Sequence, residues 1–564
     1  MTPHSTWQTV LCDSLEKVFP DQAPRPFTES VPLVAYRGQL ASFQIAVRPP
    51  RLRESTRLGD VELEIVAPPG LRADVSVVDL VPNDLAAFED ADEGYLRTGP
   101  GLFPDLLRPA PHARLQPVVG QWRALWVDVI ADAEAASGDQ TVLVRVHSLA
   151  DECVIGEFQV PVRVPSVDLA PLEIAHTEWF HCDGLADYYG FGVFSEPHWA
   201  AIENFLESAV RAGVNTILTP VWTAALDTGV TERRTPTQLL RIIDRGEEQY
   251  EFDFSGVRRW MTVCRKVGIR NLEIVHLFTQ WGARATPPMI VDTPEGPEQR
   301  FGWHVPADDP RYRRLLEQML PALRRVLDEE WGLDRVFFHV SDEPTLAHLE
   351  SFATAWGIVA DLLEGCTVID ALAELELHSK GLVALPIVSN DHADAFLDAG
   401  VPSMWLYYCV AQSRRVANRF MALPSSRSRV LGAQLYLTGA EGFLHWGFNF
   451  YNSFLSRRRI DPFRDTTAGS AFLGGDAFLV YPGPEGRPWE SIRHRVVAEA
   501  FVDHRAMAML ARCTSDGNVR AIVDPSADLT LTSFPADPDH YRRVAVALAD
   551  GLVDAAGSRS SDQA

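Results

Sequence analysis

The sequence predicts a multidomain protein of β plus α/β class: an N-terminal β-sandwich, a (β/α)8 TIM barrel, and a short C-terminal extension. Three observations predict this order. Up to residue 164, short apolar runs alternate with polar residues, a pattern typical of sandwich strands. After Pro165, strand-then-helix units repeat eight times over roughly 280 residues, which matches the size of a TIM barrel. The alternative, a doubly wound sheet, usually carries a glycine-rich nucleotide turn after its first strand, and this sequence has none.

The predicted sandwich domain covers residues 1–167. Proline and glycine separate its apolar runs, as expected where turns join short strands. The predicted strands are Ala41–Val47, Val61–Val66, Trp122–Ile130, Val142–Val146 and Phe158–Val164.

The predicted barrel covers residues 168–513. Apolar strands alternate with segments in which apolar residues recur every three or four positions, the spacing of a helix with one buried face. The eight predicted strands are Leu172–Phe180, Val214–Trp222, Arg270–Phe278, Arg335–Val340, Cys366–Ile369, Leu385–Ser389, Ser403–Cys409 and Phe443–Phe450. The clearest helices are Trp199–Arg211, Gly256–Val267, Arg311–Trp331, Leu346–Leu363 and Ser491–Cys513.

The predicted C-terminal extension covers residues 514–564. Two strand-like segments, Val519–Val523 and Leu529–Thr532, precede a final helix. From Ser558 the sequence is polar, and we expect a disordered tail there.

Composition and charge exclude several functions. The chain has 51 Lys and Arg against 76 Asp and Glu, a formal net charge of −25. Such a field repels phosphate backbones and anionic lipid, so we expect neither a nucleic-acid nor a membrane partner. Seven cysteines without a CxxC pair indicate reduced thiols, and the first ten residues carry no export signal, so we expect a cytoplasmic protein. The sequence leaves open whether it is a monomer or a homo-oligomer.

The fourth predicted strand ends in an acidic pair, Asp342-Glu343, followed by Pro344. Active sites of TIM barrels lie at the C-terminal ends of the strands. Two neighbouring carboxylates repel each other, which raises one pKa, and a carboxyl with a raised pKa can protonate a leaving oxygen near neutral pH. On the local pattern alone, an exposed acidic turn is an equal alternative.

A second catalytic carboxylate is harder to find. Ordinary retaining glycosidases need a nucleophile about 5 Å from the acid, but predicted strands seven and eight end without a carboxylate. Glu178, Asp183, Asp187 and Asp391 remain possible. Alternatively, the substrate's own 2-acetamido oxygen attacks the anomeric carbon. One carboxylate of the pair then orients that group, and its neighbour acts as acid and then base. The lone Asp-Glu pair favours this second scheme.

Aromatic and polar residues gather at the other predicted strand ends. Sugar rings stack on aromatic faces, and polar side chains bind their hydroxyls, although part of the aromatic set would equally fill the barrel core. The candidate substrate-binding residues are Glu178, Trp179, His181, Asp183, Trp222, Asn390, Trp405, Tyr407, Tyr408, His445, Trp446 and Asn449. The spacing of His176, His181, Cys182 and Asp183 is not diagnostic of a metal site, so we expect neither metal nor cofactor.

These segments, in their order and spacing, resemble glycoside hydrolase family 123. The similar pieces are Asp13–Pro20, Arg37-Gly38, Ser42–Gln44, His176–Asp183, Ser341–Pro344, Trp405, Tyr407–Cys409, Gly442–Gly447, Gly475-Asp476, Tyr481–Gly483 and Ser491–Arg493. The resemblance implies a β-sandwich followed by a (β/α)8 barrel, and a retaining β-N-acetylgalactosaminidase that works through an oxazolinium intermediate. It implies that Asp342 polarises the acetamido group and that Glu343 is the acid/base.

We therefore expect a glycoside hydrolase that releases terminal β-linked N-acetylgalactosamine from oligosaccharides or glycoconjugates. Two alternatives stay open: a glycosidase for another β-linked sugar with a different catalytic pair, and a non-catalytic carbohydrate-binding barrel. The sequence does not distinguish a galacto- from a gluco-configured sugar, or exo from endo action.

Overall fold

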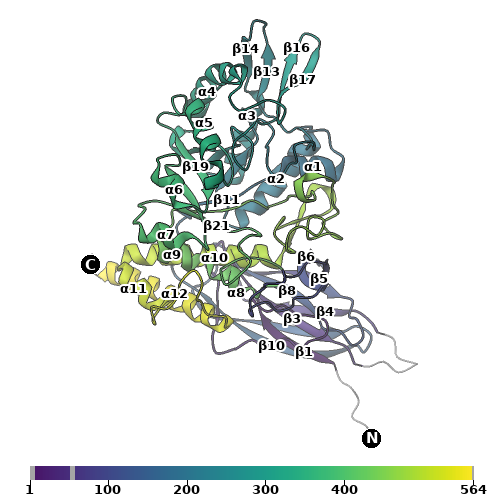
Figure 1. Cartoon of the computed structure of the whole chain (residues 1–564). Coiled ribbons are helices and arrows are strands. Elements are labelled where there is room, and N and C mark those ends of the chain that lie inside the picture. Colours follow the sequence, from purple (N-terminus) through teal and green to yellow (C-terminus); the bar gives the residue numbers. More distant parts are fainter. Residues whose placement is uncertain (1–6, 51–57, 562–564) are drawn as a thin grey trace.

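The computed structural model of the chain describes residues 7–50 and 58–561. Two N-terminal sheets lie below a closed barrel, and three helices of the C-terminal part pack beside them (Figure 1). The barrel is extended on its far side by a four-stranded sheet.

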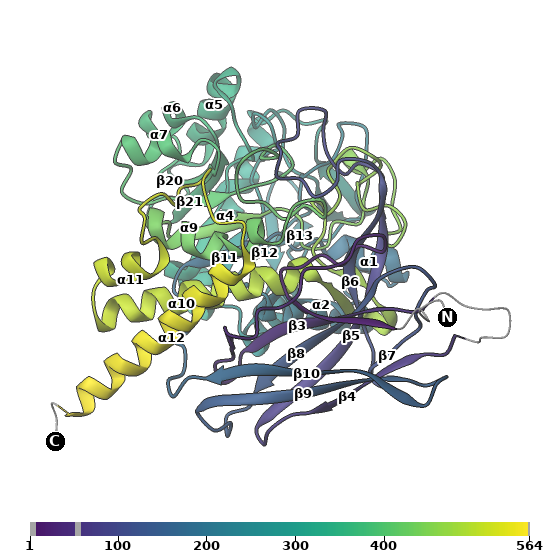
Figure 2. The same cartoon turned by 90° about the horizontal axis from the view of Figure 1, so that it is seen from below.

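The N-terminal sheets share one hydrophobic cluster. Along β9, for example, Val142, Val144 and Val146 are buried whereas the residues between them are less so, the alternation of a strand with one face in a core. Figure 2 shows the sheets as two neighbouring layers. In spatial order, the first sheet contains β1 (Gln8–Asp13), β3 (Leu40–Arg48), β8 (Arg123–Ala131), β5 (Leu71–Asn83), β6 (Gly101–Pro109), β24 (Pro488–Ser491) and β23 (Tyr481–Pro482). The second contains β2 (Leu33–Val34), β10 (Cys153–Val164), β9 (Gly138–Ser148), β4 (Val61–Val66) and β7 (Arg114–Leu115).

The first of these sheets crosses the domain boundary expected at residue 167. Its last two strands, β24 and β23, come from the part of the chain that follows the barrel strands, and β24 pairs antiparallel with β6 through Ser491 and Leu106. The N-terminal layer and the C-terminal part of the chain are therefore joined by backbone hydrogen bonds.

Eight parallel strands form the closed barrel, as the sequence predicts. The first and last strands pair in register, with Thr177 opposite Leu444, which closes the ring. In order the strands are β11 (Ala175–Glu178), β12 (Thr216–Thr219), β15 (Asn271–Ile274), β18 (Val336–Phe338), β19 (Thr367–Leu372), β20 (Leu385–Ser389), β21 (Trp405–Tyr407) and β22 (Gly442–His445).

The helices between these strands follow the predicted periodicity. In α4 the buried residues include Leu316, Leu320, Leu323 and Leu327, which lie on one face, and the carboxylate of Asp309 caps the first turn. The helices are α1 (Cys182–Tyr189), α2 (Glu196–Arg211), α3 (Ser255–Val267), α4 (Pro310–Glu330), α5 (Leu349–Val359), α6 (Leu375–Ser379), α7 (Ala393–Asp398), α8 (Ser426–Arg429) and α9 (Leu431–Thr438). The short 3-10 turns are η1 (Leu333–Arg335), η2 (Leu346–His348), η3 (Phe454–Ser456) and η4 (Pro484–Gly486). The predicted helix over 346–363 is thus divided between η2 and α5.

A four-stranded sheet that the sequence did not predict is built from the connections after the second and third barrel strands. Its order is β14 (Tyr250–Asp253), β13 (Arg241–Asp244), β16 (Met289–Thr293) and β17 (Gly296–Phe301). The strands are short and rich in charged residues, so they lack the apolar runs by which the other strands are recognised.

The C-terminal helices differ from the sequence prediction at three places. They are α10 (Ile492–Cys513), α11 (Asp516–Val523) and α12 (Pro538–Ser561). The strand predicted over 519–523 is wrong, because Ser515 caps a helix there and buries Val519 and Val523, one turn apart, on the same face. Residues 529–532 form no strand either. The backbone of α12 stays helical to Ser561, past the point where a disordered tail is expected.

Among the helices of the described ranges, none combines the length and apolar composition that a membrane crossing requires.

Candidate active site

A cavity of about 240 Å³ lies at the C-terminal ends of the barrel strands. Its walls are mainly aromatic and apolar, and a few polar groups face it, which is the usual construction of a small-molecule site. The larger apolar residues are Trp179, Leu226, Trp281, Leu444, Trp446, Phe454 and Phe472. The polar and titratable ones are His181, Asp227, Gln280, Asp342, Glu343, Tyr407 and Cys409.

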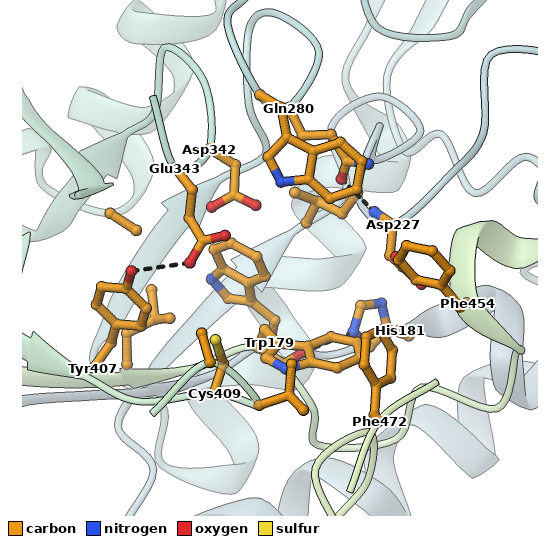
Figure 3. Close-up of a pocket in the computed structure, with 17 residues that line it drawn as sticks. Trp179, His181, Asp227, Gln280, Asp342, Glu343, Tyr407, Cys409, Phe454 and Phe472 are labelled. Atoms are coloured by element: carbon orange, nitrogen blue, oxygen red, sulfur yellow. Dashed lines mark hydrogen bonds between the residues drawn. The ribbon is translucent and has the colours of Figure 1, made fainter. Parts of the chain in front are cut away.

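Asp342 and Glu343 follow the fourth barrel strand, as predicted, and both side chains point into the cavity (Figure 3). In extended backbone, successive side chains point to opposite faces. Glu343 instead adopts a left-handed conformation, with φ at 44°. For a non-glycine residue this conformation is strained, and such strain concentrates at functional sites. The turn thus brings two consecutive carboxyls to one wall.

Two neighbours orient this pair. The hydroxyl of Tyr407, at the end of β21, donates to Oε1 of Glu343 at 2.9 Å. The backbone N–H of Trp281, from the connection after the third barrel strand, donates to the carbonyl of Asp342 at 2.9 Å. The pair is therefore held by donors from two different strand ends.

The protonation of the pair suits acid–base chemistry. Burial raises the pKa of Asp342 well above its usual value, and the adjacent Glu343 raises it further. Burial also raises the pKa of Glu343, although the hydrogen bond from Tyr407 opposes the shift. Because the two carboxyls are coupled, the pair retains a proton at a pH where a free carboxyl would have lost it.

A buried network fixes the strand end before the pair. Asp370, on β19, accepts from the backbone N–H groups of Val340 and Ser341 at 3.1 and 3.3 Å. Its Oδ1 also lies 3.2 Å from Nδ1 of His339, whose Nε2 is 2.6 Å from Oε1 of Glu273. Burial lowers the pKa of His339, but the two carboxylates outweigh it and raise the pKa to about 9. His339 is thus a buried cation at neutral pH, and its charge favours the ionised form of Asp342.

Three rings present carbon surface to the cavity because their nitrogens are engaged elsewhere. The indole N–H groups of Trp179 and Trp446 donate to Glu273 at 2.7 Å and to Asp476 at 3.0 Å. His181 donates from Nε2 to the carbonyl of Trp446 at 2.9 Å, and its Nδ1 accepts from Arg234. Burial and the Arg234 charge lower the pKa of His181 to about 3, so the ring is neutral. Such faces suit the C–H surface of a sugar ring.

A buried cation, Arg419, supports the strand ends behind the cavity. Its guanidinium donates to Glu178 at 2.6 Å, to Nδ1 of His445 at 2.7 Å and to the carbonyl of Gly447 at 2.8 Å. Burial opposes ionisation of Glu178, but the Arg419 charge outweighs it and lowers the pKa of Glu178 to about 2. Arg419 therefore joins the first and last barrel strands, where the ring closes.

We expect Arg419→Leu to destabilise the fold strongly. The substitution leaves Glu178 buried without its counter-charge, and breaking a buried pair on one side costs about 3–5 kcal/mol. The measurement is the free energy of unfolding from a denaturant titration.

Two further variants control this result. Adding Glu178→Leu to Arg419→Leu should recover part of the loss, because no isolated charge then remains. Arg245→Leu, which removes one partner of the exposed pair with Glu251, should cost less than about 1 kcal/mol. An equal effect for Arg245→Leu and Arg419→Leu would contradict a special role for the buried pair.

Of the fourteen site residues expected from the sequence, six line the cavity: Asp342, Glu343, Trp179, His181, Tyr407 and Trp446. The other eight, expected to bind substrate, lie outside its lining and contact protein instead. Three of them bind arginine: Glu178 and His445 bind Arg419, and Asp183 binds Arg234. Three form hydrogen bonds with backbone: Trp222 donates to the carbonyl of His276, Asn390 donates to the carbonyl of Ala417, and Asn449 binds the backbone of His181. The last two are packed in the protein, with Trp405 against Phe337 and Tyr408 against Phe443.

The cavity residues that the sequence did not predict include Asp227, Gln280, Phe454 and Phe472. Asp227 and Gln280 come from the connections after the second and third barrel strands, so a search for polar residues throughout these connections would have found them. Burial raises the pKa of Asp227 to about 7. The two phenylalanines belong to the long connection after the eighth strand, and nothing in the local sequence places them at the cavity.

Among the described residues, one group of potential metal ligands brings its atoms within 4.8 Å of one another: His276, His339 and Asp370. The two imidazole rings are stacked, with centroids 4.2 Å apart and planes 28° apart. Both ring nitrogens of His339 and Oδ1 of Asp370 are engaged in hydrogen bonds within the barrel. We therefore assign the group no metal.

A barrel that presents a buried carboxylate pair at its strand ends, inside an aromatic cavity, has the site of a glycoside hydrolase. The protein belongs to glycoside hydrolase family 123: residues 179–510 match the description "Glycoside hydrolase 123, catalytic domain". The resemblance drawn from the sequence motifs is thereby confirmed. No curated protein matches the sequence.

Comparison with solved structures gives one match with a similar fold and weaker matches. A family 123 glycoside hydrolase from Clostridium perfringens, described for glycolipid glycan hydrolysis, is 13% identical with a TM-score of 0.69, covering 99% of this chain and 98% of its own. The two proteins share a fold. A GH5 xyloglucanase from Bacteroides ovatus is 8% identical with a TM-score of 0.32, covering 84% of this chain and 99% of its own. A putative β-galactosidase from Bacteroides fragilis is 9% identical with a TM-score of 0.31, covering 88% of this chain and 60% of its own.

Proposed function

We propose that the protein is a retaining β-N-acetylgalactosaminidase in which the 2-acetamido group of the substrate is the nucleophile. One observation carries the proposal: the carboxylates that the sequence offered as enzyme nucleophiles lie outside the cavity lining. Each is bound by another group: Glu178 by Arg419, Asp183 by Arg234, Asp187 by Arg459 and Asp391 by His392. The Asp342-Glu343 pair remains, together with Asp227 on another side of the cavity (Figure 3).

In the first step, the acetamido oxygen forms a bond to the anomeric carbon as the glycosidic C–O bond breaks. Glu343 gives its proton to the leaving oxygen. The positive charge spreads over the oxazolinium ring, and the carboxylate of Asp342 stabilises it and holds the acetamido N–H. Burial raises the pKa of both carboxyls, so the pair shares a proton. In the proposed division of roles Glu343 holds that proton, and the cation at His339 stabilises the ionised form of Asp342.

In the second step, water attacks the anomeric carbon, and Glu343, now a carboxylate, takes its proton. The oxazolinium C–O bond breaks and the acetamido group is restored. Two displacements at the same carbon give a product with the configuration of the substrate. Glu343 ends protonated and ready for another turnover.

The cavity, of about 240 Å³, is small for a ligand site and matches one sugar residue better than a chain of several. We therefore propose that the enzyme removes a terminal sugar from oligosaccharides or glycoconjugates. The glycan of a glycolipid is one such substrate, in view of the description of the Clostridium perfringens protein.

The test compares an aryl β-N-acetylgalactosaminide with the matching aryl β-galactoside, using the purified wild-type protein. We expect cleavage of the acetamido sugar alone, with a β-configured first product by NMR. Cleavage of the plain galactoside at a similar rate would contradict acetamido participation and would point to Asp227 or Asp342 as an enzyme nucleophile. Binding of the sugar by calorimetry without release of product from either substrate would favour a non-catalytic binding barrel.

A further inference from the structure

Gln280 presents a buried donor without a partner at the wall of the cavity. Its side chain is only 4% exposed. Oε1 accepts from the backbone N–H of Asp227, whereas Nε2 has no hydrogen-bond partner in the described part of the chain. Because a backbone N–H can only donate, the amide orientation is fixed, and the free group must be the N–H donor. A buried donor of this kind costs free energy unless a ligand satisfies it.

Asp227 presents an acceptor beside that donor. Its Oδ2 accepts from the backbone N–H of Leu455 at 3.1 Å, and its carbonyl accepts from the hydroxyl of Ser456 at 2.7 Å. Oδ1 makes no hydrogen bond within the described ranges, and the residue lines the cavity. Like Glu343, Asp227 has a left-handed backbone, with φ at 41°, held by these contacts from η3. Two strained turns therefore place carboxyls at different walls of one cavity.

A free N–H donor beside a free carboxylate oxygen is complementary to a hydroxyl group, which both accepts and donates. We propose that Asp227 and Gln280 bind the C3 and C4 hydroxyls of the terminal sugar and thereby select its configuration. This inference rests on the proposed function, because it uses Asp342 and Glu343 to place the sugar.

The placement follows from ring geometry. If Glu343 faces the glycosidic oxygen on C1 and Asp342 faces the acetamido group on C2, the remaining ring carbons C3 and C4 point away from Glu343. Figure 3 shows Asp227 across the cavity from Glu343, with Gln280 between Asp227 and Asp342. The order of protein groups along the wall therefore matches the order of substituents around the sugar ring. Galacto and gluco sugars differ only in the direction of the C4 hydroxyl, which this pair would meet.

The experiment combines one enzyme variant with substrates that lack one hydroxyl. The variant is Asp227→Asn, because asparagine tolerates the left-handed conformation and keeps an oxygen for the Leu455 N–H. The substrates are an aryl β-N-acetylgalactosaminide and its 3-deoxy and 4-deoxy analogues. We expect wild-type kcat/KM to fall roughly ten- to hundredfold when the hydroxyl is removed, because a buried donor and acceptor then lose their partner.

The losses in kcat/KM caused by Asp227→Asn and by removal of the substrate hydroxyl should not be additive. Asp227→Asn should lose a similar factor on the parent sugar, yet lose little more on the deoxy analogue whose hydroxyl Asp227 binds. Asp187→Asn is the matched control: Asp187 lies in the same barrel, binds Arg459, and is outside the cavity lining, so all three substrates should react as with wild type. Equal losses for Asp227→Asn on all three substrates would overturn the inference.

Calorimetry separates this inference from the proposed function. If wild type cleaves no acetamido sugar, the proposed function fails. Binding of N-acetylgalactosamine and of its 4-deoxy analogue still tests whether Asp227 and Gln280 bind the hydroxyl. The same non-additivity, now in Kd, would support hydroxyl binding by Asp227. Additive losses in Kd, or no binding of either sugar by wild type, would overturn it.

Discussion

We expect Glu343→Gln to abolish most turnover of substrates with poor leaving groups and to affect activated aryl sugars far less. Glutamine keeps the shape of the side chain and can still accept from Tyr407, but it has no proton to give. General acid catalysis is worth roughly 10²–10⁴-fold. A nitrophenolate leaves without protonation, whereas an alkoxide does not. The measurement is kcat/KM for a nitrophenyl and an alkyl glycoside of the same sugar.

The pH profile gives an independent readout of the same role. Glu343 must be protonated to act as acid, and burial raises its pKa. On the alkaline side, activity on the alkyl glycoside should therefore fall as pH rises through that raised pKa, and protonation of Asp342 should cause a separate loss at low pH. Glu343→Gln should lack the alkaline limb. Glu350→Gln, an exposed glutamate on α5, is the control and should leave both the rate and the profile unchanged. Equal losses on both glycosides would remove Glu343 from the acid role.

The elements that the sequence predicts are those whose signal is local. Most barrel strands lie within apolar runs, and each is followed by a connection, so the strand order and the position of Asp342-Glu343 could be read directly. Glu178, which the sequence offers to the substrate, is bound by protein for a non-local reason. Arg419, 241 residues further along the chain, takes up its carboxylate. The positions of the strand ends in the sequence predict which residues lie at the top of the barrel. They do not predict which of these residues a distant cation will bind.

Contacts between residues far apart in the sequence also explain why the prediction did not include Asp227. Asp227 enters the cavity because the chain between β12 and α3 folds back, and contacts from Leu455 and Ser456 hold its backbone in place. Those contacts come from the connection after the eighth strand, which packs beside the second only once the barrel has closed. No pattern within ten residues of Asp227 encodes that neighbour. A search of the long connections would offer Asp227 as one polar residue among many, and the tertiary contacts single it out.

Asp342→Asn should cripple hydrolysis of acetamido sugars, with a loss of roughly 10²–10³-fold in kcat, the size expected when a preorganised group that stabilises transition-state charge is removed. The reason is electrostatic: the oxazolinium is cationic, and asparagine offers it a dipole in place of a charge. The amide has nearly the same shape as the carboxyl, so binding of the ground-state sugar should change much less. The measurement is kcat and KM on an aryl β-N-acetylgalactosaminide.

A stable analogue of the intermediate tests the contact itself. The thiazoline derived from N-acetylgalactosamine has the bicyclic shape of the oxazolinium, and a transition-state-like ligand should bind wild type far more tightly than the parent sugar does. Asp342→Asn should lose most of that advantage, whereas Asp187→Asn should keep it. If Asp342→Asn bound the thiazoline as tightly as wild type, Asp342 would not contact the acetamido group. The carboxylate would then act as an enzyme nucleophile or as a support for Glu343, and a trapped covalent glycosyl ester on Asp342 would decide between these two roles.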